Sequence, residues 1–304
     1  MSHLSQERAR DRTDKLNIES IVEVICSALS CGATGYTFST HPTNVEVLKA
    51  LGASGKVPRQ FDLYPVVPYA EGYVRLANEK GMTGLVNEIL SRLSLQDRAK
   101  LLVEGGFSAL RLDPAGMLKT YLDAELKGYL STKPKNATLQ SVLLHEVLTD
   151  LCLGIGEVDL LNVFAQHVHD NYNVKPGFVT YNFPRFIEFF EGEGFSLNGA
   201  VIMTPFNSLG YQMSPSRDAC KATLSNLREG DVIAMSVMAG GYLKLDEAID
   251  YVRTLPNLSG VAIGVSSREH ARDTFTRLRT MPEELSDRTE LKPTQPSDGE
   301  PNAH

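Results

Sequence analysis

The sequence predicts an α/β protein with a (β/α)8, TIM-barrel-like fold, and three observations support this. First, 304 residues with 42% hydrophobic and 22% charged side chains suffice for one barrel domain. Second, apolar runs of five to eight residues alternate with amphipathic stretches of ten to sixteen, which is typical of parallel βα units. Third, seven clear strand patterns and one weaker one are each followed by a helical pattern, which favours a barrel over an open sheet.

The N-terminal half is expected to begin with a helix rather than a strand. Residues 18–31 present a broad apolar face, and Gly32 is placed to end that helix. The elements expected next are a strand at 35–39, a helix at 44–51, a strand at 62–67 and a helix at 70–80. Pro65 places the second strand at a sheet edge or a bulge. Residues 1–17 show no strand pattern and are interpreted as a polar arm, so the first barrel strand is missing or substituted.

Residues 81–138 break this rhythm and are interpreted as a helical insertion packed on the barrel. It is expected to contain helices at 85–93, 95–103 and 115–126 and a short strand at 107–112. After it, strands are expected at 139–145, 177–181, 200–204, 231–237 and 260–265, followed by helices at 157–171, 184–193, 216–227, 245–254 and 267–279. The stretch 282–304 is rich in Pro and acidic residues without periodicity, which predicts a disordered tail and one barrel domain over 18–281.

Charge and composition argue against several classes of partner. A net charge of -7 without a basic stripe argues against nucleic acid. No apolar run approaches the roughly 20 residues of a membrane span, and the N-terminus lacks the apolar core of a signal peptide. The four cysteines are dispersed, with no pattern of a disulfide framework or a zinc site. We therefore expect a cytoplasmic protein with reduced thiols and no metal.

His145 and Glu146 are the strongest candidates for catalysis. Function in such barrels is carried by the residues that follow the strands, and His145 ends the strand expected at 139–145. With Glu146 or Asp150 it could perform acid-base chemistry. The structural alternative is a core histidine hydrogen-bonded to Thr149 or to the backbone.

His41 is a second candidate, because it follows the strand expected at 35–39. It could act as an acid, a base or a ligand. Alternatively, this segment has only a structural role, with Thr43 or Asn44 capping the next helix.

Several familiar motifs are incomplete. His167 and His169 lie two positions apart in a predicted helix, so their side chains cannot converge on one metal ion. His145 and Glu146 lack the second histidine of the zinc-protease motif. Gly154 and Gly156 lack the third glycine of a Rossmann fingerprint, and no P-loop occurs.

Three strand ends in the C-terminal half indicate a small-molecule site. The loop at 204–212 carries amides and hydroxyls, and the loop at 236–244 carries two adjacent glycines that allow close approach of a ligand. The segment 264–270 opens a helix with two serines and an arginine, which is typical of an anion site, although the serines could equally be ordinary N-caps. The residues selected are Asn207, Gly240, Gly241, Ser266, Ser267 and Arg268.

These segments resemble the aldo-keto reductase family. Residues 231–243, 246–249 and 261–270 are similar to its seventh and eighth βα units. Residues 31–51 resemble its second strand and helix, and 139–145 its fourth strand, which ends in the active-site histidine. The similarity covers about half of the chain and is strongest from Phe178 onward. It implies a barrel that binds a nicotinamide cofactor without a Rossmann domain. The 264–270 segment suggests that the cofactor is NADPH, with Ser266, Ser267 and Arg268 at its 2'-phosphate.

The catalytic set of that family matches only at His145. The family reduces carbonyl groups with a Tyr acid whose pKa is lowered by a Lys paired to an Asp. The positions of its Asp, Tyr and Lys are occupied here by Thr37, by Pro42 or Thr43, and by Pro68 with Tyr69. A tyrosine without that lysine keeps a pKa near about 10, which suits neutral pH poorly. Four tyrosines follow predicted strands and none stands out as a substitute: Tyr69, Tyr181, Tyr211 and Tyr242.

Three functions follow as hypotheses. The first is an NADPH-dependent oxidoreductase of a small carbonyl metabolite. The second is a lyase, isomerase or hydrolase that uses His145 with Glu146 or Asp150 on a small polar metabolite. The third is a non-catalytic barrel that serves as a partner subunit, because a missing first strand would expose an edge that a partner protein or a second copy could cover.

Overall fold

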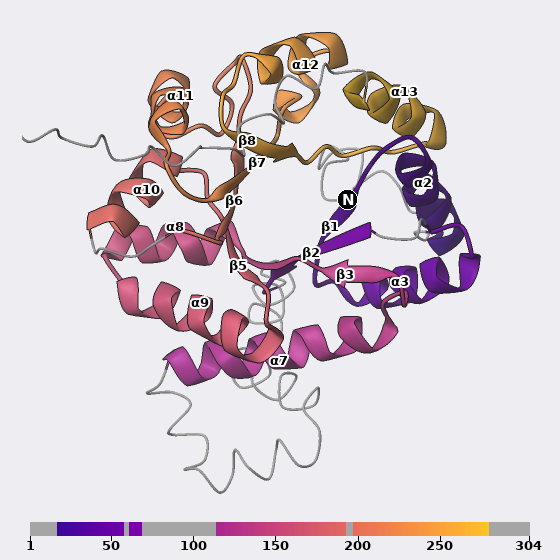
Figure 1. Cartoon of the computed structure of the whole chain (residues 1–304), viewed down its shortest axis with the longest axis horizontal. Coiled ribbons are helices and arrows are strands. Elements are labelled where there is room, and N and C mark those ends of the chain that lie inside the picture. Colours follow the sequence, from indigo (N-terminus) through magenta and orange to yellow (C-terminus); the bar gives the residue numbers. More distant parts are fainter. Residues whose placement is uncertain (1–16, 58–60, 69–113, 193–196, 280–304) are drawn as a thin grey trace, which may run out of the picture.

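The computed structural model describes residues 17–57, 61–68, 114–192 and 197–279. They form a curled sheet of parallel strands with helices outside it, as Figure 1 shows. The strands are β1 (Gly35–Ser39), β2 (Phe61–Val67), β3 (Ala137–Leu139), β4 (Ser141–Leu144), β5 (Lys175–Val179), β6 (Val201–Pro205), β7 (Asp231–Met235) and β8 (Leu258–Val261). The predicted barrel-like α/β fold is confirmed.

The order of the sheet is β1-β2-β4-β5-β6-β7-β8, with β3 also paired to β2. β3 and β4 are two halves of one strand, because both pair with β2 and the break between them is Gln140. The backbone N–H of Gln140 donates to the carbonyl of Leu63 across the break, at 3.2 Å. The single strand expected at 139–145 is therefore interrupted, and it ends one residue before His145.

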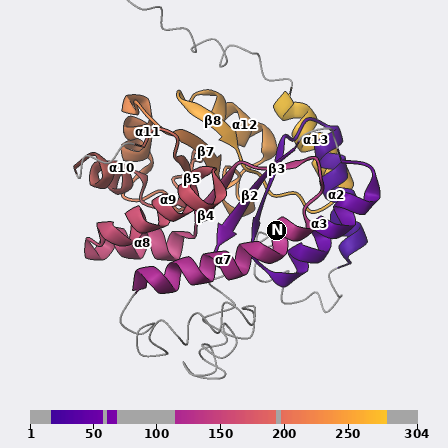
Figure 2. The same cartoon turned by 60° about the horizontal axis from the view of Figure 1, so that its bottom comes forward.

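The helices are α2 (Ile18–Ser30), α3 (Pro42–Ser54), α7 (Pro114–Thr132), α8 (Glu146–Ile155), α9 (Val158–Tyr172), α10 (Phe183–Gly192), α11 (Arg217–Asn226), α12 (Leu245–Arg253) and α13 (Arg268–Arg279), with a short 3-10 turn η1 (Ala239–Gly241). α7 packs between α3 and α9 (Figure 2). α8 was not predicted, because its ten residues are mostly apolar and too short to show a clear helical period.

Within the described ranges, the sheet is open between β8 and β1. These two strands do not pair in the described part of the chain, although α13 packs directly on α2. Ser27 Oγ of α2 donates to the carbonyl of Arg268 at 3.2 Å, and Glu23 lies 3.7 Å from the Arg268 guanidinium. Among the residues described, the ring of helices therefore closes where the ring of strands does not.

Some expectations fall outside the described residues. They are the arm at 1–16, the helices at 70–80, 85–93 and 95–103, the strand at 107–112, and the tail at 282–304.

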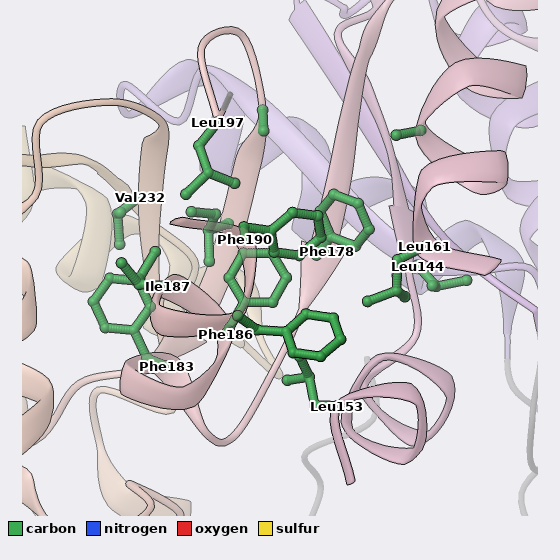
Figure 3. Close-up of a cluster of buried hydrophobic side chains, with 14 of the residues drawn as sticks. Leu144, Leu153, Leu161, Phe178, Phe183, Phe186, Ile187, Phe190, Leu197 and Val232 are labelled. Carbon is green, nitrogen blue, oxygen red and sulfur yellow. The ribbon is translucent and has the colours of Figure 1, made fainter. Parts of the chain in front are cut away.

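The main core lies between the sheet and the helices. Phe178 of β5 meets Phe186 and Phe190 of α10 with ring centroids 5.2 and 5.4 Å apart, and all three rings are fully buried (Figure 3). A second, smaller cluster fills the inside of the curled sheet, where Val179 and Met203 are buried. β6 is buried and apolar along almost its whole length, as is typical of strands in parallel sheets that are covered on both faces.

Candidate functional site

All the strand C-termini lie at one end of the curled sheet, because every pairing is parallel. We call the segments that directly follow these termini the mouth. It includes residues 40–41, 145–150, 180–182, 206–216 and 236–242. Function in barrels of this kind is located at this end.

His145 is the N-cap of α8. Its Nδ1 accepts a hydrogen bond from the backbone N–H of Val147 at 3.2 Å, which in the neutral ring leaves the proton on Nε2. Nε2 has no hydrogen-bond partner among the described residues. The hydroxyl of Thr149 donates to the carbonyls of Leu144 and His145 rather than to the imidazole. The imidazole is therefore fixed from one side and free to donate from the other.

Glu146 lies next to this imidazole and is also linked to β5. Its Oε2 is 3.2 Å from His145 Nδ1, so the carboxylate lies directly beside the imidazole. Its Oε1 accepts from the hydroxyl of Tyr181 at 3.4 Å. The side chains of His145 and Glu146 are 16% and 22% exposed, so both are largely enclosed yet reachable from solvent. We call His145, Glu146 and Tyr181 the acid-base cluster.

Tyr181 is thereby singled out from the four candidate tyrosines. Burial, followed by the nearby charge of Glu146 and the hydrogen bond to it, raises the pKa of Tyr181 well above its usual value. This is the opposite of the lysine-lowered tyrosine of the aldo-keto reductase family. Tyr181 therefore remains a protonated hydrogen-bond donor that orients Glu146.

Asp150 lies one turn further along α8 and contacts the same loop. It accepts hydrogen bonds from the Thr180 hydroxyl and, at 3.0 Å, from the backbone N–H of Tyr181. Burial raises the pKa of Asp150, and these two hydrogen bonds only partly oppose the rise. Of the two carboxylates considered with His145, Glu146 contacts the imidazole, and Asp150 holds the backbone of Tyr181.

His41 lies two strands away in the sheet, since β2 separates β1 from β4. It caps α3 itself, with Nδ1 accepting from the backbone N–H of Thr43 at 3.2 Å. The expected cap at Thr43 or Asn44 was therefore wrong, because Asn44 instead bonds Tyr36 and the carbonyl of Ser39. His41 shares the mouth with His145 but caps a different helix.

Asn207 is a structural link between two mouth loops. Its fully buried amide accepts from the N–H of Tyr211 at 2.8 Å and donates to the carbonyls of Tyr211 and Ser236 at 2.9 and 3.3 Å. Gly240 and Gly241 adopt φ of 70° and 98° around η1, which glycine tolerates best. These three residues fix the shape of the loops, so Asn207 has little capacity left for a cofactor.

The start of α13 does not fit the phosphate of NADPH well. Ser267 caps the helix by accepting from the N–H of His270 at 3.1 Å. Ser266 is exposed beside it, and Arg268 is 63% exposed with its guanidinium paired to Glu23. That carboxylate brings negative charge to the place where a phosphate needs positive charge.

Within the described ranges no group of three or more His, Cys, Asp or Glu side chains is placed to hold a metal ion. Likewise, no helix that the structure describes has the length and apolarity required to cross a bilayer.

Comparisons with known proteins support the fold. No protein-family model matches the chain, and no curated protein matches its sequence. Among solved structures it is similar to a Pseudomonas aeruginosa protein described as a "putative aldo-keto reductase", with a TM-score of 0.53 and 12% identity. The match covers 86% of this chain and 82% of the other. At this identity the match establishes a shared aldo-keto-reductase-like barrel fold.

Proposed function

We propose that the protein is an acid-base enzyme that moves a proton beside a carbonyl group of a small polar molecule. The observation that carries this proposal is the acid-base cluster, in which Glu146 contacts both the His145 imidazole and the Tyr181 hydroxyl. Its members come from the ends of two neighbouring strands, β4 and β5. A carboxylate base beside a neutral imidazole donor is a known arrangement for enolisation in barrel enzymes.

The reaction is a reversible proton transfer. Glu146 takes a proton from the carbon next to the carbonyl, and the electron pair of the broken C–H bond forms a C=C bond. The carbonyl π electrons move to oxygen, where His145 Nε2–H donates a hydrogen bond to the developing negative charge. Glu146 then returns the proton to the same carbon as the carbonyl re-forms. Tyr181 holds the carboxylate in place through its other oxygen.

The test is hydrogen-deuterium exchange at the α-carbon of butan-2-one in D2O, followed by proton NMR. We expect catalysis by the wild-type protein and a loss of about 100-fold or more in Glu146→Gln and His145→Gln. Glu188→Gln, which removes an exposed carboxylate on α10, is the matched control and should exchange at the wild-type rate. A Glu146→Gln protein with the full rate would refute the proposal.

A second candidate is an NADPH-dependent reductase of a small carbonyl compound. The similarity to a described aldo-keto reductase favours it, whereas the contacts of Asn207 and the Arg268–Glu23 pair weigh against it. A titration with NADPH, followed by nucleotide fluorescence, decides whether this candidate holds. The readout is clean because the protein has no Trp to contribute emission. Micromolar NADPH binding weakened by Arg268→Ala would favour the reductase, and no binding would exclude it.

The compartment and partners follow as proposals. All four cysteines are free of disulfides, which supports the proposal of a reducing compartment such as the cytoplasm. A small-molecule substrate is the partner that the acid-base cluster favours. A second copy or another protein at the open edge between β8 and β1 is the alternative, to be tested by sedimentation.

A further inference from the structure

The large apolar side chains exposed in the described part of the chain gather on segments that follow strand C-termini. They are Val147, Leu151 and Ile155 on α8, Leu209 and Tyr211 after β6, and Tyr242 after β7. Exposed apolar groups of this kind mark sites of interaction. Two of them, Tyr211 and Tyr242, are aromatic and lie beside each other.

Tyr211 is held in place through its backbone. Asn207 bonds both its N–H and its carbonyl, and the same amide reaches the carbonyl of Ser236 at the end of β7. The ring lies against Gly240, where an added Cβ would approach its Cζ and Oη to 3.6 Å. Although it is restrained in this way, the residue is 40% exposed, so part of its side chain is accessible to a ligand.

Tyr242 projects from a similarly defined turn. The N–H of Gly241 donates to the carbonyl of Met238 at 2.9 Å, and the N–H of Leu243 to the same carbonyl at 3.2 Å. Tyr242 is 80% exposed, and its ring centroid is 6.4 Å from that of Tyr211. The two loops thus present a pair of rings on a defined backbone.

The pair is connected to the acid-base cluster. The loop that carries Tyr211 bonds the loop that carries Tyr181, since the N–H of Ser214 donates to the carbonyl of Tyr181 at 2.9 Å. The Tyr211 phenol also lies near enough to contribute to the raised pKa of Tyr181. A molecule that contacts Tyr211 is therefore close to Tyr181, which contacts Glu146.

We propose that Tyr211 and Tyr242 form an aromatic subsite that receives a flat, apolar group, such as a phenyl ring, on the substrate. This inference rests on the proposed function, because it assigns the substrate class of the same mouth. Aromatic rings attract one another in edge-to-face and offset arrangements, and restrained aromatic side chains lose little conformational freedom on binding. The two tyrosines select the substrate, whereas the acid-base cluster performs the proton transfer.

The experiment compares two ketones, 4-phenylbutan-2-one and butan-2-one. They share the same polar head, and the phenyl ring is remote from the acidic carbon-hydrogen bonds of the methyl group. Exchange of these methyl hydrogens in D2O measures turnover, and saturation-transfer NMR measures binding of the phenyl ring without requiring turnover. We expect wild-type protein to prefer the phenyl ketone and to transfer saturation to its ring protons.

The variants are Tyr211→Ala, Tyr242→Ala, Tyr211→Phe and, as an exposed apolar control from the far end of α8, Ile155→Ala. Each alanine at a tyrosine should lower the preference for the phenyl ketone by about threefold to tenfold and weaken saturation transfer. Tyr211→Phe and Ile155→Ala should retain both. Measurable exchange of both ketones at equal rates, or an unchanged preference in both tyrosine-to-alanine variants, would overturn the proposal.

The two readouts separate this inference from the proposed function. If neither ketone exchanges but saturation transfer to the phenyl ring depends on Tyr211 and Tyr242, the subsite is supported and the proton-transfer function fails. If both ketones exchange alike and the tyrosine variants change nothing, the function is supported and the subsite fails. If wild-type protein shows no saturation transfer to the phenyl ring, the subsite is refuted.

Discussion

The two sides of the curled sheet differ in how completely their strands are paired. β5 and β6 each pair with a strand on both sides, whereas β1 and β8 each pair on one side only within the described ranges. Correspondingly, the inward side chains Val179 and Met203 are buried, while Ile233 and Tyr64, nearer the open edge, are only partly buried. We refer to the side at β5 and β6 as the closed side, and to the side at β8 and β1 as the open side.

This difference shows where the protein can hold a precise site. The residues of the acid-base cluster directly follow β4 and β5, next to the phenylalanine-rich core of α10. His41 stands on β1, on the open side. Sites on well-packed elements keep their geometry better than sites at an edge, so the closed side is the better support for catalysis.

The largest expected effect concerns the core of the closed side. Phe178→Ala should lower the free energy of unfolding by about 3–5 kcal/mol, because it removes a fully buried ring that contacts Phe164, Phe186 and Phe190. Denaturant unfolding measures this. Ile233→Ala, at a half-buried inward position nearer the open side, should cost roughly half as much. Equal losses would remove the distinction between the two sides.

Hydrogen exchange tests the same difference more locally, with an expected effect of intermediate size. Backbone amides of β5 and β6 should exchange at least about 100-fold more slowly than those of β1 and β8, because an edge strand opens without disrupting the core. Native-state exchange followed by mass spectrometry resolves these segments. Strong protection of β1 and β8 would instead indicate that both edges are covered in solution.

A smaller effect on the free energy of unfolding should depend on pH. Because burial raises the pKa of Asp150 in the folded protein, its contribution to stability is fully present below about pH 3.8 and is lost as the pH rises through the folded pKa. Asp150→Asn removes this titration. The stability of wild-type protein relative to the variant should therefore fall as the pH rises above that value. Unfolding measured at several pH values checks this, and a constant difference would contradict it.

The smallest effect is expected at the contact between α13 and α2. Arg268→Ala breaks an ion pair between two largely exposed side chains, and such pairs contribute about 0–1 kcal/mol. Thermal unfolding should change little. A large loss of stability would mean that this ion pair is critical for closing the ring of helices.

Local patterns predicted much of the fold. The strand at Gly35–Ser39 and the start of α12 at Leu245 agree with the expectation, since alternation and helical period mark them clearly. The break at Gln140 and helix α8 escaped prediction, because one depends on pairing with β2 and the other is short and mostly apolar.

The candidate site was predictable in part, because some of its residues directly follow a strand in the sequence. His145 and Glu146 follow a strand in the sequence and could be selected from it. The role of Tyr181 could not, because its bond to Glu146 joins residues 35 positions apart. Nor could the sequence reveal that the Asn207 amide bonds its own loop.

The contact of α13 with α2 also constrains how the chain can be assembled. The hydrogen bond from Ser27 to Arg268 joins residues 241 positions apart, so it cannot form until almost the whole described chain has been synthesised. Until then, the side of α2 that packs on α13 has no partner from that helix. Long-range contacts of this kind slow folding. A ribosome-bound chain that stops before residue 268 would therefore present an unfinished ring to chaperones and proteases, whatever the stability of the completed protein.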